Sequence, residues 1–174
     1  MLKGDKVFLR AVEPSDATLL MLWENDTENW KVTDTEVPFS LHGIMQLIDQ
    51  QQDFRSTGLL RFVICEVESE RPVGTIDLYD ADFRNGNAAV GILIANQQSR
   101  NKGYALQSLE LMLNYTEKVL DLHNVTCSIQ ATNQESIHLF EKAGFQKVGV
   151  RKEWFRVQGK RIDEMIYQRC LKTK

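Results

Sequence analysis

A polar, basic stretch in the middle of the chain, SRNKGYA at residues 99–105, separates two apolar segments with different periodicities. The segment before it, AAVGILIA, is a nearly continuous apolar run of strand length, whereas leucines recur at helical spacing after it. The first N–H groups of a helix lack an intrahelical partner and lie at the positive end of the helix dipole, so they bind anions readily. Gly103 permits close approach to the backbone, and Arg100 and Lys102 add positive charge. The stretch therefore predicts a phosphate or pyrophosphate site, with an ordinary strand-to-helix turn as the alternative.

A second polar group, NQESIHLFEKAGF at residues 133–145, follows the next apolar segment. Asn133 is placed to cap the helix that begins there. Gly144 is typical of a left-handed helix stop, over which Phe145 packs back. Both groups thus join a strand-like segment to a helix, and they follow each other along the chain.

Together the two groups resemble the signature of the GNAT superfamily of N-acetyltransferases. Its acetyl-CoA motif, Q/R-x-x-G-x-G/A, is met by Arg100, Gly103 and Ala105. Its later element, N…(Y/F)-E-K-x-G-F, is met by Asn133, Phe140, Glu141, Lys142, Gly144 and Phe145. The resemblance covers essentially the whole chain. The ending GVRKEWFRVQGKRIDEMIYQ resembles the branch that holds ribosomal-protein N-terminal acetyltransferases and spermidine acetyltransferases.

The resemblance implies that acetyl-CoA lies between two parallel strands that splay apart like a V, opened by a bulge in the first. The pantetheine arm then hydrogen-bonds to that strand as an added strand would. Cosubstrate binding is assigned in this way to Ile92, Leu93 and Ile94, to Arg100, Asn101, Lys102, Gly103, Tyr104 and Ala105, and to Asn133, Ser136, Phe140 and Lys142. Asn133 is expected to reach the pantetheine, with a plain helix cap as an equal alternative.

The family commonly transfers the acetyl group by direct attack of the amine on the thioester, without an acyl-enzyme. A backbone N–H of the splayed strand polarises the thioester carbonyl. The chain departs from the family pattern at the position of the general acid. The family's usual general acid is a tyrosine, and this chain has Phe140 there. A thiolate with a pKa of ~8.5 needs little help in leaving, and Ser136 or a water is expected to protonate it. Cys127 is expected to be a core residue.

A glutamate that the family often carries early in the splayed strand is also missing, since Ala88 and Ala89 occupy this region. We therefore expect Asp77 to be the general base, with Asp80, Asp82 and Glu153 as further candidates. Strand alternation places Asp77 and Tyr79 on one face and Asp80 on the other. A solvated strand end remains the alternative for the aspartates, since most carboxylates are exposed.

The acceptor is expected to be a small cationic amine, including a polyamine such as spermidine. Residues 24–36 hold five carboxylates against one lysine, and relatives place this connection beside the acceptor entrance. Trp30, Asp34 and Glu36 are the candidates for contact with ammonium groups. A solvated acidic loop is the alternative. A protein N-terminus or lysine as acceptor, or a non-catalytic CoA-binding sensor, are the alternative functions.

Composition and charge limit the number of domains and the classes of function. The 174 residues are 43% hydrophobic and 26% charged, which predicts one domain over residues 1–174. The net charge of −3 does not favour a nucleic-acid partner, and no apolar run approaches the ~20 residues of a membrane span. No signal peptide is expected, and three scattered cysteines suit a reducing cytoplasm without a metal site. The resemblance further implies a homo-oligomer.

These residues must be positioned by strands and helices that alternate along the chain. The patterning predicts strands at 6–12, 61–67, 73–79, 88–95, 125–131, 147–156 and 161–170. Helices are expected at 17–25 and 41–53, after residue 103 and from residue 133. Short turns make the early strands antiparallel, whereas the helix between 88–95 and 125–131 makes that pair parallel. The fold class is therefore α/β with a mixed, mostly antiparallel seven-stranded sheet, a parallel splayed central pair and about four helices.

Overall fold

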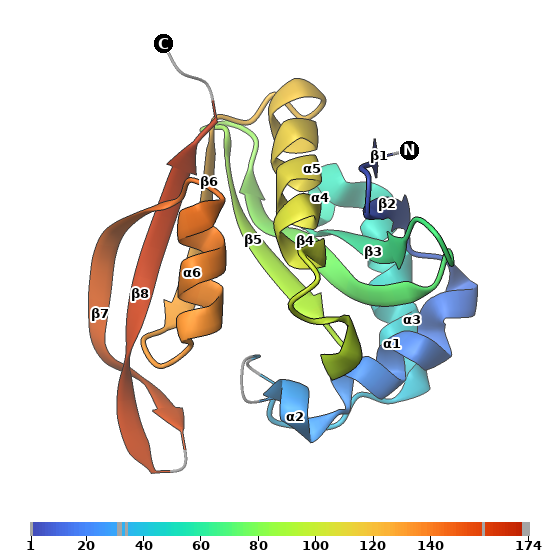
Figure 1. Cartoon of the computed structure of the whole chain (residues 1–174), viewed down its shortest axis with the longest axis horizontal. Coiled ribbons are helices and arrows are strands. Elements are labelled where there is room, and N and C mark those ends of the chain that lie inside the picture. Colours follow the sequence, from blue (N-terminus) through green and yellow to red (C-terminus); the bar gives the residue numbers. More distant parts are fainter. Residues whose placement is uncertain (1, 31–32, 34, 158, 172–174) are drawn as a thin grey trace.

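The computed structural model of the chain describes residues 2–30, 33, 35–157 and 159–171. One eight-stranded sheet runs through the molecule in the order β1-β2-β3-β4-β5-β6-β8-β7 (Figure 1). The strands are β1 (Leu2–Lys3), β2 (Val7–Ala11), β3 (Leu60–Glu66), β4 (Pro72–Asp82), β5 (Asn87–Ile94), β6 (Asn124–Gln130), β7 (Gln146–Val157) and β8 (Lys160–Cys170). The α-helices are α1 (Ala17–Glu24), α2 (Thr27–Trp30), α3 (Leu41–Gln50), α4 (Phe54–Thr57), α5 (Tyr104–Lys118) and α6 (Gln134–Lys142).

The predicted α/β class and mixed sheet are confirmed, with two differences in detail. The two-residue strand β1 at the sheet edge was not predicted, because so short a segment carries no alternation. The single-turn helices α2 and α4 were not predicted either. The last strand, β8, lies between β6 and β7, a position that the sequence pattern did not address. No helix among the described residues is long and apolar enough to cross a membrane.

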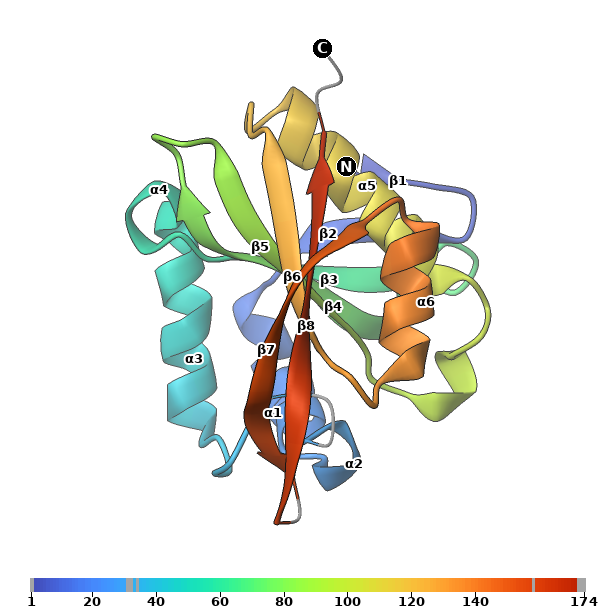
Figure 2. The same cartoon turned by 90° about the vertical axis from the view of Figure 1, so that its left-hand side faces the viewer.

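Helices cover both faces of the sheet, as Figure 2 shows for α3 on one side and α6 on the other. Strand β3 shows why both faces need a cover. Its successive side chains point to opposite faces of the sheet, and Val63, Ile64 and Cys65 are all 0% exposed. Ile64 packs in the cluster that contains Leu109 of α5. Val63 packs in the cluster that contains Leu20 of α1. The central strands are therefore held rigidly from both sides.

The parallel pair β5 and β6 separates after a short paired segment. Its register is Asn87 with Asn124, Ala88 with Val125 and Ala89 with Thr126. Beyond these pairs β5 continues along β4 to Ile94, and β6 continues along β8 to Gln130. The expected V-shaped opening is therefore present from Val90 onward (Figure 1).

The prediction of a bulge in β5, the first of the two splayed strands, is wrong. The pairing of β5 with β4 keeps one register from Ala89 to Ile94. The register shift lies between Tyr79 and Asp82, where β4 and not β5 carries the additional residue. Asp80, inside this shift, has a positive φ of 51°. An extra residue bends and twists the strand that carries it, so the bend lies in the neighbour of β5.

Candidate active site

Two cavities meet at the splay of β5 and β6. The first, here called the turn pocket, has a volume of about 400 Å³ and lies against residues 99–106 and the start of α6. The second, the carboxylate pocket, has a volume of about 350 Å³ and is walled by β4, β5, β6 and β8. Both cavities are lined by Ile92, Leu93, Asn133 and Ser136. The site therefore consists of two adjacent cavities with chemically different walls.

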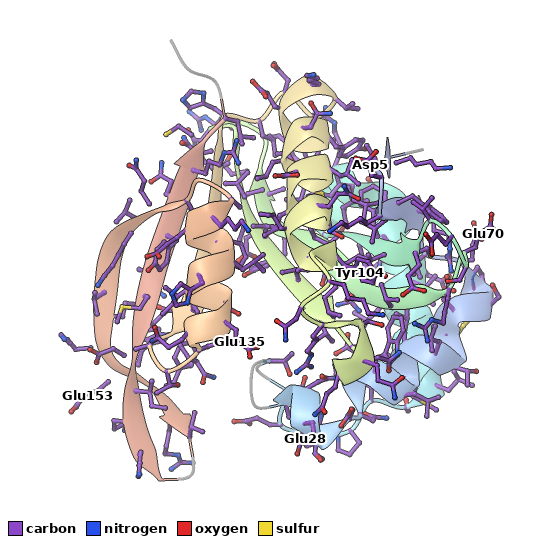
Figure 3. All side chains as sticks on the ribbon, in the orientation of Figure 1. Asp5, Glu28, Glu70, Tyr104, Glu135 and Glu153 are labelled. Atoms are coloured by element: carbon purple, nitrogen blue, oxygen red, sulfur yellow. The ribbon has the colours of Figure 1, made fainter. Side chains whose placement is uncertain are left out.

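The structure brings the predicted cosubstrate residues together. All of them except Lys102 and Phe140 line the turn pocket, and Phe140 lines the carboxylate pocket instead. Tyr104 begins α5 and Glu135 lies near the start of α6 (Figure 3). Residues as far apart in the sequence as Ile92 and Lys142, fifty positions, thus line one cavity.

The turn at the start of α5 is built around Gly103. This glycine has φ +83°, in the left-handed region, and a Cβ there would lie 3.1 Å from Lys6 Nζ. Lys6 Nζ also donates to the carbonyl of Lys102 at 3.1 Å. Sequence patterning did not identify Lys6 because it lies 96 residues away in the chain. The turn therefore offers an anion the first N–H groups of α5, which have no intrahelical partner, and the ammonium group of Lys6.

Arg100 of the signature is held by two protein groups. Its Nε donates to the carbonyl of Ile94 at 3.1 Å and its Nη2 donates to Asn29 Oδ1 at 3.2 Å. Asn29 is 1% exposed, and its Nδ2 donates to the carbonyl of Trp23 at 3.1 Å. Arg100 therefore fixes the end of β5 and helix α2 relative to the turn.

Glu66, the last residue of β3, holds the first residue of α5 in place. The Tyr104 hydroxyl donates to Glu66 Oε1 at 3.0 Å. Hydrogen bonds from Ser69, Arg71 and Tyr104, that of Ser69 being the strongest influence, lower the pKa of Glu66 to about 2. Glu66 is thus ionised at neutral pH and restrains the ring of Tyr104.

The start and end of α6 follow the sequence pattern. Asn133 Oδ1 accepts the N–H of Ser136 at 3.1 Å, so the helix-cap role is present in the structure. Gly144 has φ +81° and ends the helix, and the N–H of Phe145 returns to the carbonyl of Phe140 at 3.0 Å. The two phenylalanine rings pack edge to face with centroids 5.1 Å apart. Phe140, 4% exposed, is therefore a fixed apolar wall where the family commonly has a hydroxyl.

The carboxylate pocket is named for Glu24, Asp77 and Glu164, which line it together with Arg61. Arg61 donates to both oxygens of Asp77, at 2.8 and 2.7 Å, and to Glu24 Oε1 at 2.8 Å. Burial opposes the charge on Arg61, but the two carboxylates outweigh it and raise the pKa of the guanidinium. Asp77, the predicted base, is thus tied at both oxygens rather than solvated at a strand end.

The other base candidates lie away from both cavities. Asp80 is exposed, and Asp82 accepts the N–H of Asn85 at 3.0 Å in the turn that follows β4. Glu153 is exposed on the outer side of β7, as Figure 3 shows. Cys127 lines the carboxylate pocket as a buried residue, and burial raises the pKa of its thiol.

Glu164 was missed by the sequence reasoning. It is 4% exposed, and Arg151 Nη1 donates to its Oε2 at 2.8 Å. Alternation along β8 puts it on the same face as Ile162 and Ile166. A carboxylate between the two isoleucines of one strand face was therefore the signal in the sequence that could have indicated a buried functional group. The sequence does not show that β8 pairs with β6, which is what brings Glu164 to the pocket.

The predicted acceptor residues are less centrally placed. Trp30 is half-buried, and its Nε1 donates to the carbonyl of Glu24 at 2.6 Å. Glu36 is exposed, and neither residue lines the two cavities. Asp34 lies outside the described residues. Of the acidic residues in 24–36 that the structure describes, Glu24 alone lines the carboxylate pocket.

The family model described as an acetyltransferase (GNAT) domain matches residues 6–146. The chain belongs to this family. An N-acetyltransferase called p20 from Bacillus licheniformis is 24% identical over 164 residues, covering 94% of this chain and 92% of that protein. Spermidine N(1)-acetyltransferase of Vibrio cholerae is 28% identical over 103 residues, covering 59% of this chain and 58% of that protein. The chain is therefore a GNAT-type N-acetyltransferase.

Solved structures of GNAT proteins share the fold. Spermidine N-acetyltransferase from Vibrio cholerae in complex with CoA and spermine superposes with a TM-score of 0.87 at 21% identity, with 97% of each chain covered. A dodecameric structure of the Vibrio cholerae enzyme superposes with a TM-score of 0.81 at 22% identity, covering 97% of this chain and 95% of that one. At these identities the likeness establishes the architecture.

Proposed function

We propose that the chain transfers an acetyl group from acetyl-CoA to a primary amine of a small cationic acceptor, a polyamine such as spermidine. The observation that carries this proposal is the carboxylate pocket, which opens into the turn pocket at the splay. Three carboxylates and one guanidinium line it. An excess of negative charge in a walled cavity favours a cation, because a buried ammonium needs charged partners.

The turn pocket fits acetyl-CoA. The Gly103 turn exposes the first N–H groups of α5, and Lys6, Arg100 and Lys102 surround it. An anion such as a pyrophosphate is stabilised by such a helix start. Beyond Ala89 the inner edge of β5 has lost its partner strand, so Ile92 to Ile94 offer backbone groups to an extended pantetheine arm. The thioester would then lie where the two pockets meet.

The chemistry is a direct transfer. An acceptor amine with a pKa of ~10.4 must lose a proton before it attacks the thioester carbon. The backbone N–H groups of β5 at the junction are placed to stabilise the oxyanion. The C–S bond then breaks, and the thiolate of CoA, with a pKa of ~8.5, leaves with little assistance. This ease of departure fits a site in which Phe140 replaces a proton donor.

We also propose that the protein forms a homo-oligomer. The edge strand β7 exposes Val148, at 58%, and Trp154, at 57%. Light scattering of the purified protein measures the state directly, and a monomer at micromolar concentration would contradict this part of the proposal.

The function is tested by detecting free thiol when acetyl-CoA is mixed with spermidine, spermine, a peptide with a free N-terminus and a lysine peptide. The polyamines are expected to be the best acceptors. Turnover of peptides alone would favour a protein amine. Acetyl-CoA binding without thiol release from any amine would favour a CoA-binding sensor.

A further inference from the structure

The carboxylate pocket contains acidic groups in two different states. Glu24 and Asp77 share Arg61, and Asp77 gives both of its oxygens to the guanidinium. A proton placed on Asp77 would remove an acceptor from a buried positive charge, which is costly. Asp77 is therefore a counter-ion of Arg61 through both oxygens, and Glu24 is a second counter-ion of the same buried guanidinium.

Glu164 is held differently, on the opposite wall. Among the residues that the structure describes, the one donor to its carboxylate is Arg151, which reaches Oε2 and whose side chain is 51% exposed. A carboxylate has about four acceptor positions, so one bond leaves room for a further donor. Phe140 and Phe155 line the same cavity, so a donor that enters meets apolar walls as well as this carboxylate.

We propose that Glu164 is the residue that accepts the proton of the acceptor's ammonium group. The inference rests on the proposed N-acetyltransferase function and extends it to deprotonation of the acceptor. The family often has a glutamate for this step in the strand that corresponds to β5, where this chain has Ala88 and Ala89. The ammonium N–H bond breaks and its proton passes to Glu164, directly or through one water. The freed nitrogen pair bonds to the thioester carbon, and the C–S electrons leave with sulfur. The second proton of the new N–C nitrogen passes through water to the thiolate, and the proton of Glu164 is released afterwards to solvent.

The charged and titratable groups around Glu164 come from several elements. Arg151 approaches from β7, and Cys127 lies on the neighbouring strand β6. Across the cavity are Arg61 with its two carboxylates and the ring of Tyr79. The Cys127 thiol stays protonated through neutral pH because burial raises its pKa.

The test compares Glu164→Gln with the wild type, using Glu153→Gln as a matched control because Glu153 is exposed on the outer side of β7. At pH 7 the Glu164→Gln variant is expected to lose about 10²-fold or more in kcat/KM for the best amine. Glu164→Asp should recover part of this loss, and Glu153→Gln should stay within about threefold of the wild type. Acetyl-CoA affinity, measured by calorimetry, should be unchanged, because Glu164 does not line the turn pocket.

A pH series separates proton transfer from a structural role. Raising the pH from 7 to about 9.5 increases the fraction of free amine by more than about 100-fold, so the defect of Glu164→Gln should shrink with pH. A defect that is constant with pH, or a loss below about threefold, would overturn the assignment while the wild type still turns over. Absence of thiol release by the wild type with every amine would instead overturn the proposed function together with this inference.

Discussion

Arg100, in the turn that precedes α5, donates a hydrogen bond from Nη2 to Oδ1 of Asn29 in α2 at 3.2 Å. The bond joins the residues that line the turn pocket to the segment that contains Glu24 and Trp30. Both of its partners make second bonds, Arg100 to the carbonyl of Ile94 and Asn29 to that of Trp23. The hydrogen bond between Arg100 and Asn29 therefore connects the turn pocket to the segment that holds Glu24 of the carboxylate pocket.

Asn29→Ala should weaken this connection. The substitution removes the Asn29 acceptor of a guanidinium N–H and one donor to the Trp23 carbonyl, which keeps the backbone N–H of Asp26, and we expect this to cost about 1–3 kcal/mol of stability. Acetyl-CoA affinity is expected to fall by up to about tenfold, equivalent to about 1.4 kcal/mol. Chemical denaturation and calorimetry measure the two effects, with Asn114→Ala on the exposed side of α5 as the control. Equal acetyl-CoA affinities for the two variants would show that α2 does not support the turn.

Gly103→Glu should abolish acetyl-CoA binding, and Gly159→Glu is its matched control. Both glycines have positive φ, +83° and +79°, so each substitution carries a similar backbone strain of roughly 1–2 kcal/mol. A Cβ added at Gly159 meets no described atom within 4 Å, whereas one at Gly103 lies 3.1 Å from Lys6 Nζ, and a glutamate there brings negative charge to the anion site. Calorimetry should detect binding only for Gly159→Glu. Binding by folded Gly103→Glu would place the cosubstrate elsewhere.

Phe140→Tyr restores the hydroxyl that relatives use. The ring keeps its edge-to-face contact with Phe145, so the melting temperature should change little. We expect kcat to change by less than about 10²-fold, because a positioned acid contributes ~10²–10⁴-fold and thiolate is already a good leaving group. Stopped-flow or steady-state thiol release measures kcat. A larger gain would mean that thiolate protonation limits the natural enzyme.

Glu66→Gln should destabilise the protein only when Glu66 is ionised. The folded-state pKa of Glu66, about 2, is lower than its ordinary value of 4.5, so its contribution is complete above about pH 4.5. The contribution is lost as the pH falls toward 2, because protonation removes the charge that the hydrogen-bond donors stabilise. Melting temperatures of wild type and variant should therefore differ at pH 7 and converge near pH 2. A difference that persists unchanged at pH 2 would contradict an ionic role.

Local patterning was sufficient for the turn pocket. The apolar run of β5, the helical spacing of α5 and the cap at Asn133 are all encoded by neighbouring residues, so the residues of the signature could be placed before the structure was known. Their assignment to acetyl-CoA came from the family resemblance and not from periodicity.

The carboxylate pocket depends on contacts that no local pattern contains. Glu164 reaches it because β8 inserts between β6 and β7 and pairs Glu164 with Gln130. Arg61 binds both Asp77 and Glu24, and Glu24 lies 37 residues before Arg61 in the chain. Such pairings follow from strand order and register, which turn residues and hydrophobicity do not determine. For this reason the sequence indicated an acidic acceptor loop, whereas the structure places the carboxylates on the cavity walls.

The splay of β5 and β6 has a consequence for the lifetime of the protein. The described ladder between β5 and β6 holds three residue pairs, fewer than the β4–β5 or β6–β8 ladder beside it, so we expect local opening of the sheet to begin at this seam. A cosubstrate bound along the seam would resist this opening and add about 2.7 kcal/mol of stability at 100 times its Kd. Digestion by a nonspecific protease should therefore slow markedly when acetyl-CoA is added. In a cell, proteolytic turnover of the protein would then follow the supply of acetyl groups.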